Sequence, residues 1–291
     1  MKRHDKLPLK KAYYRIFTGM IVIPLVLVLV LSLVILGMQY REQAIENIRG
    51  VQKGVAAELQ SDVDFMSMRL SQLINVNDNM VIQYAVAMNE ADQDARYDAQ
   101  KKLDQAGNMV IEPVKDVVSI GFYMKNGNAF FLKSSIKRTI EETRAKQWYQ
   151  DALQNLNSVK IGSYQTRKAS DLYLGGSRDQ LVLIYALSPN SMIDRSQSVE
   201  MVVLYQTSDA GNAIRNYNRN YIRGNNKLGI MQIVGENGEA IYKTEEIAVK
   251  AARGYTCVRT PIELENATWY IESYIRTAEL MQDFVKIALV I

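Results

Sequence analysis

The chain has 291 residues, with 35 Lys and Arg against 31 Asp and Glu, but only one cysteine and one histidine. Six of the basic residues precede residue 16, where Asp5 is the only acid, so the positive charge belongs to a short tail and does not indicate a nucleic-acid partner. Cys257 has no second cysteine with which to form an intramolecular disulfide, and His4 lies in the tail. Zinc sites built from His and Cys, and Ser-His-Asp or Cys-His catalysis, are therefore excluded from the rest of the chain.

Residues 16–38 form an apolar stretch without a charged side chain. A helix of this length reaches about 35 Å and can cross a hydrocarbon core of about 30 Å. No small-residue cleavage pattern follows it, which favours an uncleaved anchor over a signal peptide. By the positive-inside rule, residues 1–15 are cytoplasmic and residues 39 to about 283 are extracytoplasmic.

A second apolar stretch occupies residues 284–291 and is too short to span a bilayer. We interpret residues 281–291 as the start of a second transmembrane helix, and we expect the natural protein to continue beyond Ile291. The protein is thus predicted to lie in the cell membrane and to contact membrane lipid.

Residues 39–88 carry helical signals that only Gly50 and Gly54 interrupt. Apolar residues recur there at steps of 3, 4 and 7, with Gln52 and Asp62 in the same register. The members of this stripe are Ile45, Ile48, Val55, Leu59, Met66, Leu70 and Leu73. Two interpretations stay open: the stripe packs on its own domain, or it forms a parallel homodimer contact close to the membrane.

Beyond residue 114 the pattern changes to short strands. The strand signals cover residues 117–124, 129–132, 159–166, 180–187, 199–206, 229–234, 240–242, 255–260 and 268–275. Asn126-Gly127 and Asn237-Gly238 each separate two such runs, as in a hairpin whose central residues need positive φ. We therefore predict an α+β fold with two antiparallel-sheet modules, at residues 89–208 and 209–280, that a helix over residues 210–221 connects.

The strand run at residues 255–260 contains Cys257, which we interpret as a small buried structural thiol and not as a nucleophile. No Gly-rich phosphate loop or dinucleotide fingerprint occurs, so no nucleotide site or cofactor is predicted. We also predict no metal site and no catalytic residues, since the acids Glu141 and Glu142 suit the start of a helix.

A small-molecule pocket needs an apolar aromatic lining with a few converging polar groups. Arg144 or Lys146 would contact an anionic group, with Arg offering a bidentate fork for a carboxylate. The candidate aromatic residues are Tyr123, Trp148, Tyr149, Tyr164, Tyr185 and Tyr205. The alternative is that these aromatic residues fill the core between a helix and a sheet, and that Arg144 is a solvated helix charge.

The element order resembles that of double Cache (PAS-like) sensor domains, as do the patches at residues 144–149, 229–242 and 261–274. Trp148 and Tyr149 match the aromatic pair of that family. In its amino-acid-binding subgroup an arginine stands two positions before the tryptophan, where this chain has Lys146. The aspartate that the subgroup has near the end of the last distal strand is also not found in residues 202–206, which does not favour amino-acid specificity.

The resemblance implies an extracytoplasmic sensor whose membrane-distal module binds a small molecule, such as an amino acid, organic acid, amine or sugar. Its membrane helices would pass the signal to a cytoplasmic output, which in a two-component sensor is a histidine kinase. The same sensor could feed a chemoreceptor or a cyclic-di-nucleotide enzyme. A membrane-anchored surface hydrolase or adhesin is the alternative of another class.

Overall fold

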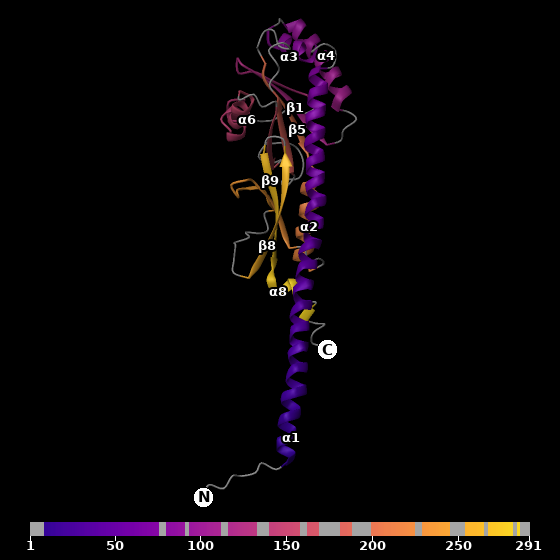
Figure 1. Cartoon of the computed structure of the whole chain (residues 1–291). Helices are drawn as coiled ribbons and strands as arrows, with labels where there is room; N and C mark the ends of the chain where they lie inside the picture. The colour runs from indigo at the N-terminus through magenta and orange to yellow at the C-terminus, as the bar shows by residue number, and fades with distance from the viewer. Residues whose placement is uncertain are drawn as a thin grey trace.

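One long helix runs along one side of the other elements and projects beyond them (Figure 1). The computed structural model describes residues 9–75, 80–90, 93–111, 116–132, 140–157, 162–168, 181–187, 199–224, 229–244, 254–264, 267–281 and 284–285. The helix is built from α1 (Leu9–Phe17), a wide π-helical turn η1 (Thr18–Val22) and α2 (Ile23–Asn75). Pro24 accounts for the wide turn, because it lacks an N–H group and its ring clashes with the carbonyl one turn earlier. The predicted interruptions Gly50 and Gly54 lie inside α2, which passes through both.

Two shorter helices, α3 (Met80–Glu90) and α4 (Gln93–Ile111), lie at the far end of α2 (Figure 1). Leu103 of α4 is fully buried and belongs to the same core cluster as Leu70 of α2. The helices therefore cap the distal end of the molecule, on the opposite end from the apolar stretch.

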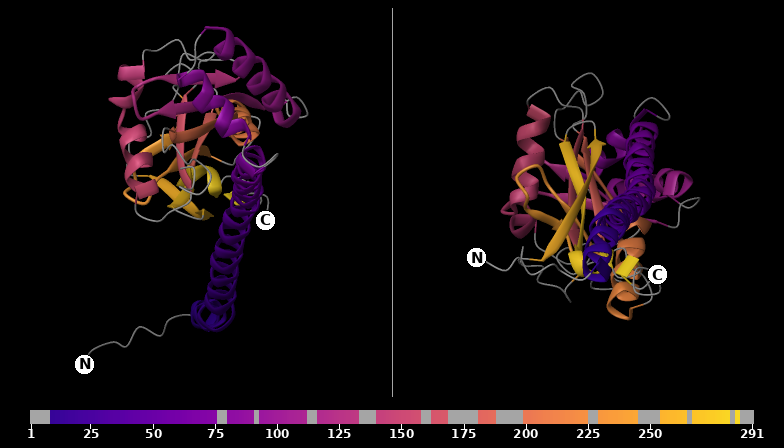
Figure 2. Two further views of the ribbon diagram at one scale, coloured as in Figure 1. Left: turned by 90° about the horizontal axis from the view of Figure 1, so that it is seen from above. Right: turned by 60° about the horizontal axis from the view of Figure 1, so that its bottom comes forward.

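The distal module is a five-stranded antiparallel sheet in the order β2-β1-β5-β4-β3. Its strands are β1 (Val117–Met124), β2 (Ala129–Leu132), β3 (Gly162–Lys168), β4 (Leu181–Leu187) and β5 (Val199–Thr207). The first two form the predicted hairpin, in which Gly127 has a φ of 99°. Helices α5 (Ile140–Arg144) and α6 (Gln147–Asn157) lie on one side of this sheet and α2 on the other (Figures 1 and 2). With both faces covered, every residue of β4 is buried.

The proximal module follows α7 (Asp209–Ile222) and is a four-stranded antiparallel sheet in the order β7-β6-β9-β8. Its strands are β6 (Ile230–Val234), β7 (Ala240–Tyr242), β8 (Tyr255–Leu264) and β9 (Ala267–Arg276), followed by the short helix α8 (Thr277–Leu280). β8 extends four residues beyond the predicted end, through Pro261. It can do so because it is an edge strand, where proline leaves no sheet hydrogen bond unmade. The two antiparallel sheets confirm the predicted α+β class.

The predicted apolar stripe of α2 packs against other elements of the same chain. Leu59, Leu70 and Leu73 are fully buried, and Ile48, Val55 and Met66 are buried almost as completely. They share core clusters with residues of both sheets, including Trp269 of β9. The stripe is therefore the seam between α2 and the two modules, and it is not available as a dimer contact.

Cys257 lies in a strand, as predicted, but the expectation that it is buried is wrong. Successive side chains of β8 alternate between the two faces of the sheet, so that Val258 and Thr260 face α2 while Cys257 and Arg259 face outward. The thiol is exposed and free.

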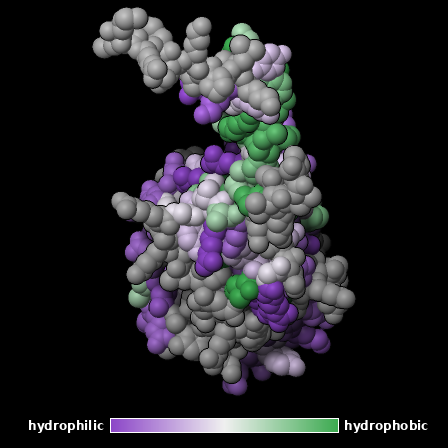
Figure 3. All heavy atoms as spheres, turned by 90° about the horizontal axis from the view of Figure 1, so that it is seen from below, coloured by the Kyte–Doolittle hydropathy of each residue, from purple (hydrophilic) through white to green (hydrophobic). Residues whose placement is uncertain are grey.

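In the described part of the chain, one helix is long and apolar enough to cross a membrane, and its most apolar window has none of its residues buried. Side chains such as Val28 and Leu31 are about half exposed, although they are apolar. Figure 3 shows these hydrophobic residues along the helix that projects from a largely hydrophilic body. The expected second transmembrane helix falls mostly on residues 286–291, which lie outside the described residues.

Candidate functional site

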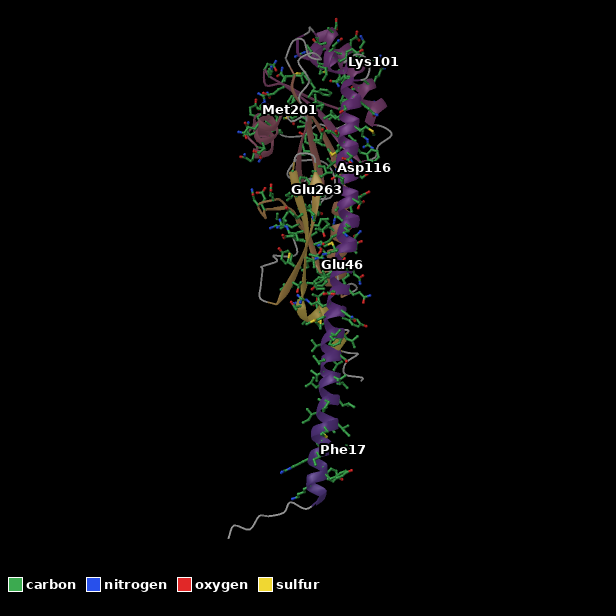
Figure 4. All side chains as sticks on the ribbon, in the orientation of Figure 1. Phe17, Glu46, Lys101, Asp116, Met201 and Glu263 are labelled. Carbon is green, nitrogen blue, oxygen red and sulfur yellow. The ribbon has the colours of Figure 1, made fainter. Side chains whose placement is uncertain are left out.

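The face of the distal sheet that turns toward α6 carries a buried aromatic and aliphatic cluster. Because side chains alternate along a strand, every second residue of β1, β4 and β5 reaches this face. The cluster consists of Tyr123, Tyr149, Ala152, Val182, Ile184, Ala186, Met201, Val203 and Tyr205. Figure 4 shows Met201 on the α6 side of the sheet. Three of the residues predicted to line a ligand pocket, Tyr123, Tyr149 and Tyr205, lie in this cluster and are buried, as the alternative of core packing between a helix and a sheet expects.

Three of the predicted site residues meet in this cluster. The phenol oxygens of Tyr123 and Tyr205 share a hydrogen bond of 2.7 Å. The rings of Tyr123 and Tyr149 pack edge to face, with their centroids 5.2 Å apart. Such pairs add about 0.5 to 1.5 kcal/mol to the stabilisation from burial alone. The three tyrosines thus form a rigid wall contributed by β1, β5 and α6.

Gly121 of β1 makes room for this wall. A Cβ atom added there would lie 2.9 Å from the Phe131 ring and 3.1 Å from the Tyr123 ring. These distances are shorter than a carbon contact allows, so a side chain at this position would force the rings apart. The glycine therefore has a packing role in addition to any backbone role.

A charged pair closes the edge of the cluster where β1 and β5 meet the turn between α5 and α6. The Arg144 guanidinium forms a salt bridge of 2.9 Å with Glu200 and also donates to the carbonyl of Met124. The phenol of Tyr149 donates to the same Glu200 carboxylate at 2.6 Å. The two side chains are 28% and 22% exposed, so Arg144 is paired with Glu200 at a partly exposed edge, and a ligand carboxylate would have to compete with Glu200 there.

The three tyrosines stay protonated across the physiological range. Burial raises the pKa of Tyr123 to about 12. Burial raises the pKa of Tyr205 well above its ordinary value, and so does the neighbouring Tyr123 phenol. Burial, followed by the Glu200 carboxylate, raises the pKa of Tyr149. The three tyrosines are therefore neutral, and the Arg144 and Glu200 pair places formal charges at their edge.

Other predicted site residues lie elsewhere. Tyr185 faces α2, where its phenol donates to Ser67 at 3.1 Å. The strand alternation that brings Ile184 to the α6 face sends Tyr185 to the opposite face. Lys146 is exposed in the turn between α5 and α6. Trp148 belongs to α6 and Tyr164 to β3, but their side chains lie outside the described part of the structure.

Sequence reasoning missed Glu200. The available signal was a carboxylate inside the otherwise apolar run at residues 199–204. Glu200 stands at an irregularity of the β1 and β5 pairing, where the register shifts between Tyr123 and Met124. Only the tertiary structure shows that this shift turns Glu200 toward Arg144. Within the described residues, no group of His, Cys, Asp or Glu could hold a metal ion.

No protein-family model and no curated protein matches this sequence. Among solved structures, the ligand-binding domain of the Pseudomonas aeruginosa PAO1 amino acid chemoreceptor PctB in complex with L-Arg matches with a TM-score of 0.50 and 9% identity, over 84% of this chain and 93% of that one. A domain of a putative sensory box/GGDEF family protein from Vibrio parahaemolyticus matches with a TM-score of 0.49 and 11% identity, over 84% of this chain and 98% of that one. The extracellular domain of the putative histidine kinase vpHK1S-Z8 matches with a TM-score of 0.47 and 12% identity, over 82% and 94%. The PctB likeness shows the fold alone: this chain shares the overall arrangement of that ligand-binding domain.

Proposed function

We propose that this chain is the extracytoplasmic sensing region of a membrane-bound two-component sensor histidine kinase. The observation that carries the proposal is the continuity of α2, which runs without a break from the apolar segment through the cores of both modules. A rearrangement in the distal module would therefore move the same helix that enters the membrane. The positive tail at residues 1–15 supports a cytoplasmic N-terminus.

The proposed ligand is a small molecule that binds in the distal module against the tyrosine wall. Amino acids, organic acids, amines and sugars are the classes to test. The PctB domain is in complex with L-Arg, which keeps amino acids among the classes to test even though Lys146 departs from the pattern of the amino-acid-binding subgroup. Because Arg144 is paired with Glu200, binding of a carboxylate would cost that salt bridge, whereas an amine could approach Glu200 from its exposed side.

The proposed signal is a shift between two arrangements of a parallel homodimer. A ligand shifts such an equilibrium only by its differential affinity for the two states. The α2 stripe cannot supply the dimer contact, because it is buried within the protomer. The outer face of α2 is open instead, with Phe65 and Met68 about half exposed.

Two other functions remain to be distinguished from this one. The same sensor could serve a chemoreceptor or a cyclic-di-nucleotide enzyme, as the variety of similar domains allows. The gene sequence after Ile291 separates these outputs, since a phosphorylatable histidine and an ATP-binding region would identify the kinase. A surface hydrolase or adhesin predicts no signalling domain there.

A thermal-shift screen of the purified chain tests ligand binding. A ligand at 100 times its dissociation constant should stabilise the protein by about 2.7 kcal/mol. We expect Trp148→Ala to reduce the shift, and Tyr185→Phe, on the opposite face of the distal sheet, to leave it unchanged. A shift that survives replacement of Arg144, Lys146, Trp148 and Tyr149 together in a folded protein would refute the distal pocket.

A further inference from the structure

Helix α7 runs alongside α2 toward the apolar segment. At its start, the Ser208 hydroxyl donates to the Asp62 carboxylate of α2. At its other end, Tyr221 packs against the cluster that contains Ile48 of α2. Asp62 and Ile48 are separated by about 21 Å of helix, and the 14 residues of α7 also span about 21 Å. The helix α7 is therefore antiparallel to α2, and its C-terminal end is the end nearer the apolar segment; the right-hand view of Figure 2 shows α7 in orange beside α2.

The C-terminal end of α7 is joined to α8, which lies close to the apolar stretch. The phenol of Tyr221 donates to the Glu279 carboxylate of α8 at 2.6 Å. Just beyond α8, Met281 and Phe284 approach Gly37, where an added Cβ atom would lie 3.2 Å from each side chain. Gly37 belongs to the last turn of the apolar stretch. The end of α7 is therefore held next to the point at which α2 leaves that stretch.

This level corresponds to the edge of the lipid headgroup layer. Ala44 and Ile45 of α2 pack with Tyr221 in one cluster, and they follow Met38, the last residue of the apolar stretch, by about 9 to 10 Å of helix. The headgroups add about 5 to 7 Å on each side of the hydrocarbon core. A long side chain at the end of α7 can cover the remaining distance. This step rests on the membrane topology of the proposed function, but not on ligand binding.

The exposed face of α7 at this end is basic and apolar. Arg219 and Arg223 are both exposed and stand four positions apart, so they lie on one side of the helix. Ile222, next to them, is 54% exposed. The opposite side of α7 holds Ile214 and Asn218 in the core. In the described part of the chain neither guanidinium forms an ion pair, so this end presents two unpaired positive charges beside a large apolar side chain.

The charges around this end also favour an anionic partner. Five arginines and three glutamates occur in the described segments at this level, which are residues 41–49, 219–224 and 276–281. Glu46 pairs with Arg49, and Glu279 accepts from Tyr221 with Arg276 at 4.0 Å. Arginine near the end of a helix also offsets the helix dipole, so charge by itself would not identify a partner. The position of this positive surface beside the membrane identifies it.

We propose that the C-terminal end of α7 docks on the headgroups of anionic phospholipids, with Arg219 and Arg223 contacting phosphate groups and Ile222 entering the interface beside them. Arginine suits phosphate because its planar fork can donate two parallel hydrogen bonds. Each basic residue next to an anionic membrane surface favours the contact by about fivefold, which corresponds to about 1 kcal/mol. Because α7 lies on one side of α2, the contact would fix the tilt of α2, since interfacial arginines are among the anchors that set helix tilt.

Fluorescence quenching of the full chain in lipid vesicles tests this contact. In a Cys257→Ser background, a bimane label on Asn220→Cys reports on the exposed end of α7, and the quencher is a phosphatidylcholine with a nitroxide on its headgroup. We expect at least about threefold stronger quenching in equal parts phosphatidylcholine and phosphatidylglycerol than in phosphatidylcholine alone. Arg219→Gln with Arg223→Gln should remove this lipid dependence, as should about 1 M salt, where the Debye length is about 3 Å. Arg219→Lys with Arg223→Lys should retain most of it, because the charge is kept.

The control label is on Tyr97→Cys, since Tyr97 is 73% exposed on α4 at the opposite end of the molecule. Equal quenching of the Asn220→Cys label in the two kinds of vesicle would overturn the proposal, as would a lipid dependence that survives the glutamine pair or is as strong at Tyr97→Cys. A label on Val28→Cys, inside the apolar stretch, should be quenched by acyl-chain nitroxides in both. If it is quenched while the Asn220→Cys label shows no lipid dependence, the docking surface is wrong and the membrane anchor stands. If it is not quenched, the membrane topology is wrong and the docking surface with it.

Discussion

Replacing Gln52 tests how α2 is fastened to the proximal sheet. Gln52 is fully buried in α2, and its amide nitrogen donates to the carbonyl of Val258 at 2.9 Å and to Ser273 Oγ at 2.8 Å. The hydroxyl of Thr260 donates to the Gln52 amide oxygen at 2.6 Å. One side chain thus joins the helix to both β8 and β9.

The expected cost of Gln52→Ala follows from these contacts. Each hydrogen bond contributes about 1 kcal/mol net, and a buried polar group left without a partner costs about 1 to 3 kcal/mol. Removing the amide breaks these three bonds and a longer one of 3.4 Å to the carbonyl of Ile271, and it leaves the hydroxyls of Thr260 and Ser273 in the core. We therefore expect Gln52→Ala to lower the free energy of unfolding by about 3 to 5 kcal/mol.

The assay is a urea titration of the purified chain in detergent, followed by tryptophan fluorescence, to which Trp269, buried in the same module, contributes. Gln60→Ala is the matched control, because Gln60 lies on the same helix and donates to Asp64 at the surface, and we expect it to cost less than about 0.5 kcal/mol. Gln52→Leu combined with Thr260→Val and Ser273→Ala removes all three side-chain partners and should recover most of the loss. Equal effects of Gln52→Ala and Gln60→Ala would refute the reasoning.

Three further predictions concern other parts of the protein. Tyr123→Phe should lower the free energy of unfolding by about 1 kcal/mol, because it removes the hydrogen bond to Tyr205. The double change with Tyr205→Phe should cost less than the sum of the two single changes, because it leaves neither phenol without its partner. Additive losses in thermal melts would contradict this shared hydrogen bond. Gly121→Ala should destabilise the protein by about 1 to 3 kcal/mol, because the added methyl group clashes with the Phe131 and Tyr123 rings. Gly54→Ala is the control: the space around Gly54 is open, so this change should stabilise the protein by up to about 1 kcal/mol. Similar effects of the two changes in urea titrations would argue against the packing role of Gly121. Burial raises the pKa of Asp62 above its ordinary value near 3.8, so the unfolded chain loses this proton first and stability falls as the pH rises through that window. Asp62→Asn should therefore raise the free energy of unfolding at pH 7, by less than about 1 kcal/mol at this half-exposed site, and in thermal melts the gain should vanish below about pH 4.

Much of the fold could be predicted because its signals are local. Asn126-Gly127 and Asn237-Gly238 marked both hairpins, and the alternation of apolar residues located the strands around them. The strand β8 was predicted to end just before Pro261, because a proline usually ends a central strand. It continues past Pro261 because β8 is an edge strand, and the order of strands in a sheet cannot be known from one segment of the sequence.

The candidate site was harder to predict, because it depends on which face each side chain reaches. Tyr123, Tyr149 and Tyr205 were among the predicted pocket residues, and they pack together in one buried cluster. Tyr185 has the same side chain in the same sheet, yet it contacts α2. A shift of one position along a strand exchanges the two faces, and the sequence does not state which face α6 will cover.

The sequence by itself determined the apolar stretch that is long enough to span a membrane, the basic tail before it, the two hairpin modules and the exclusion of histidine and intramolecular disulfide chemistry from residues 16–291. These follow from composition and from short-range backbone geometry. The tertiary structure alone decided that the α2 stripe is the core seam of one protomer, that Glu200 holds Arg144, and that Gly37 receives Met281 and Phe284. Each of these depends on contacts between residues far apart in the chain, and such contacts are set by packing and not by local sequence.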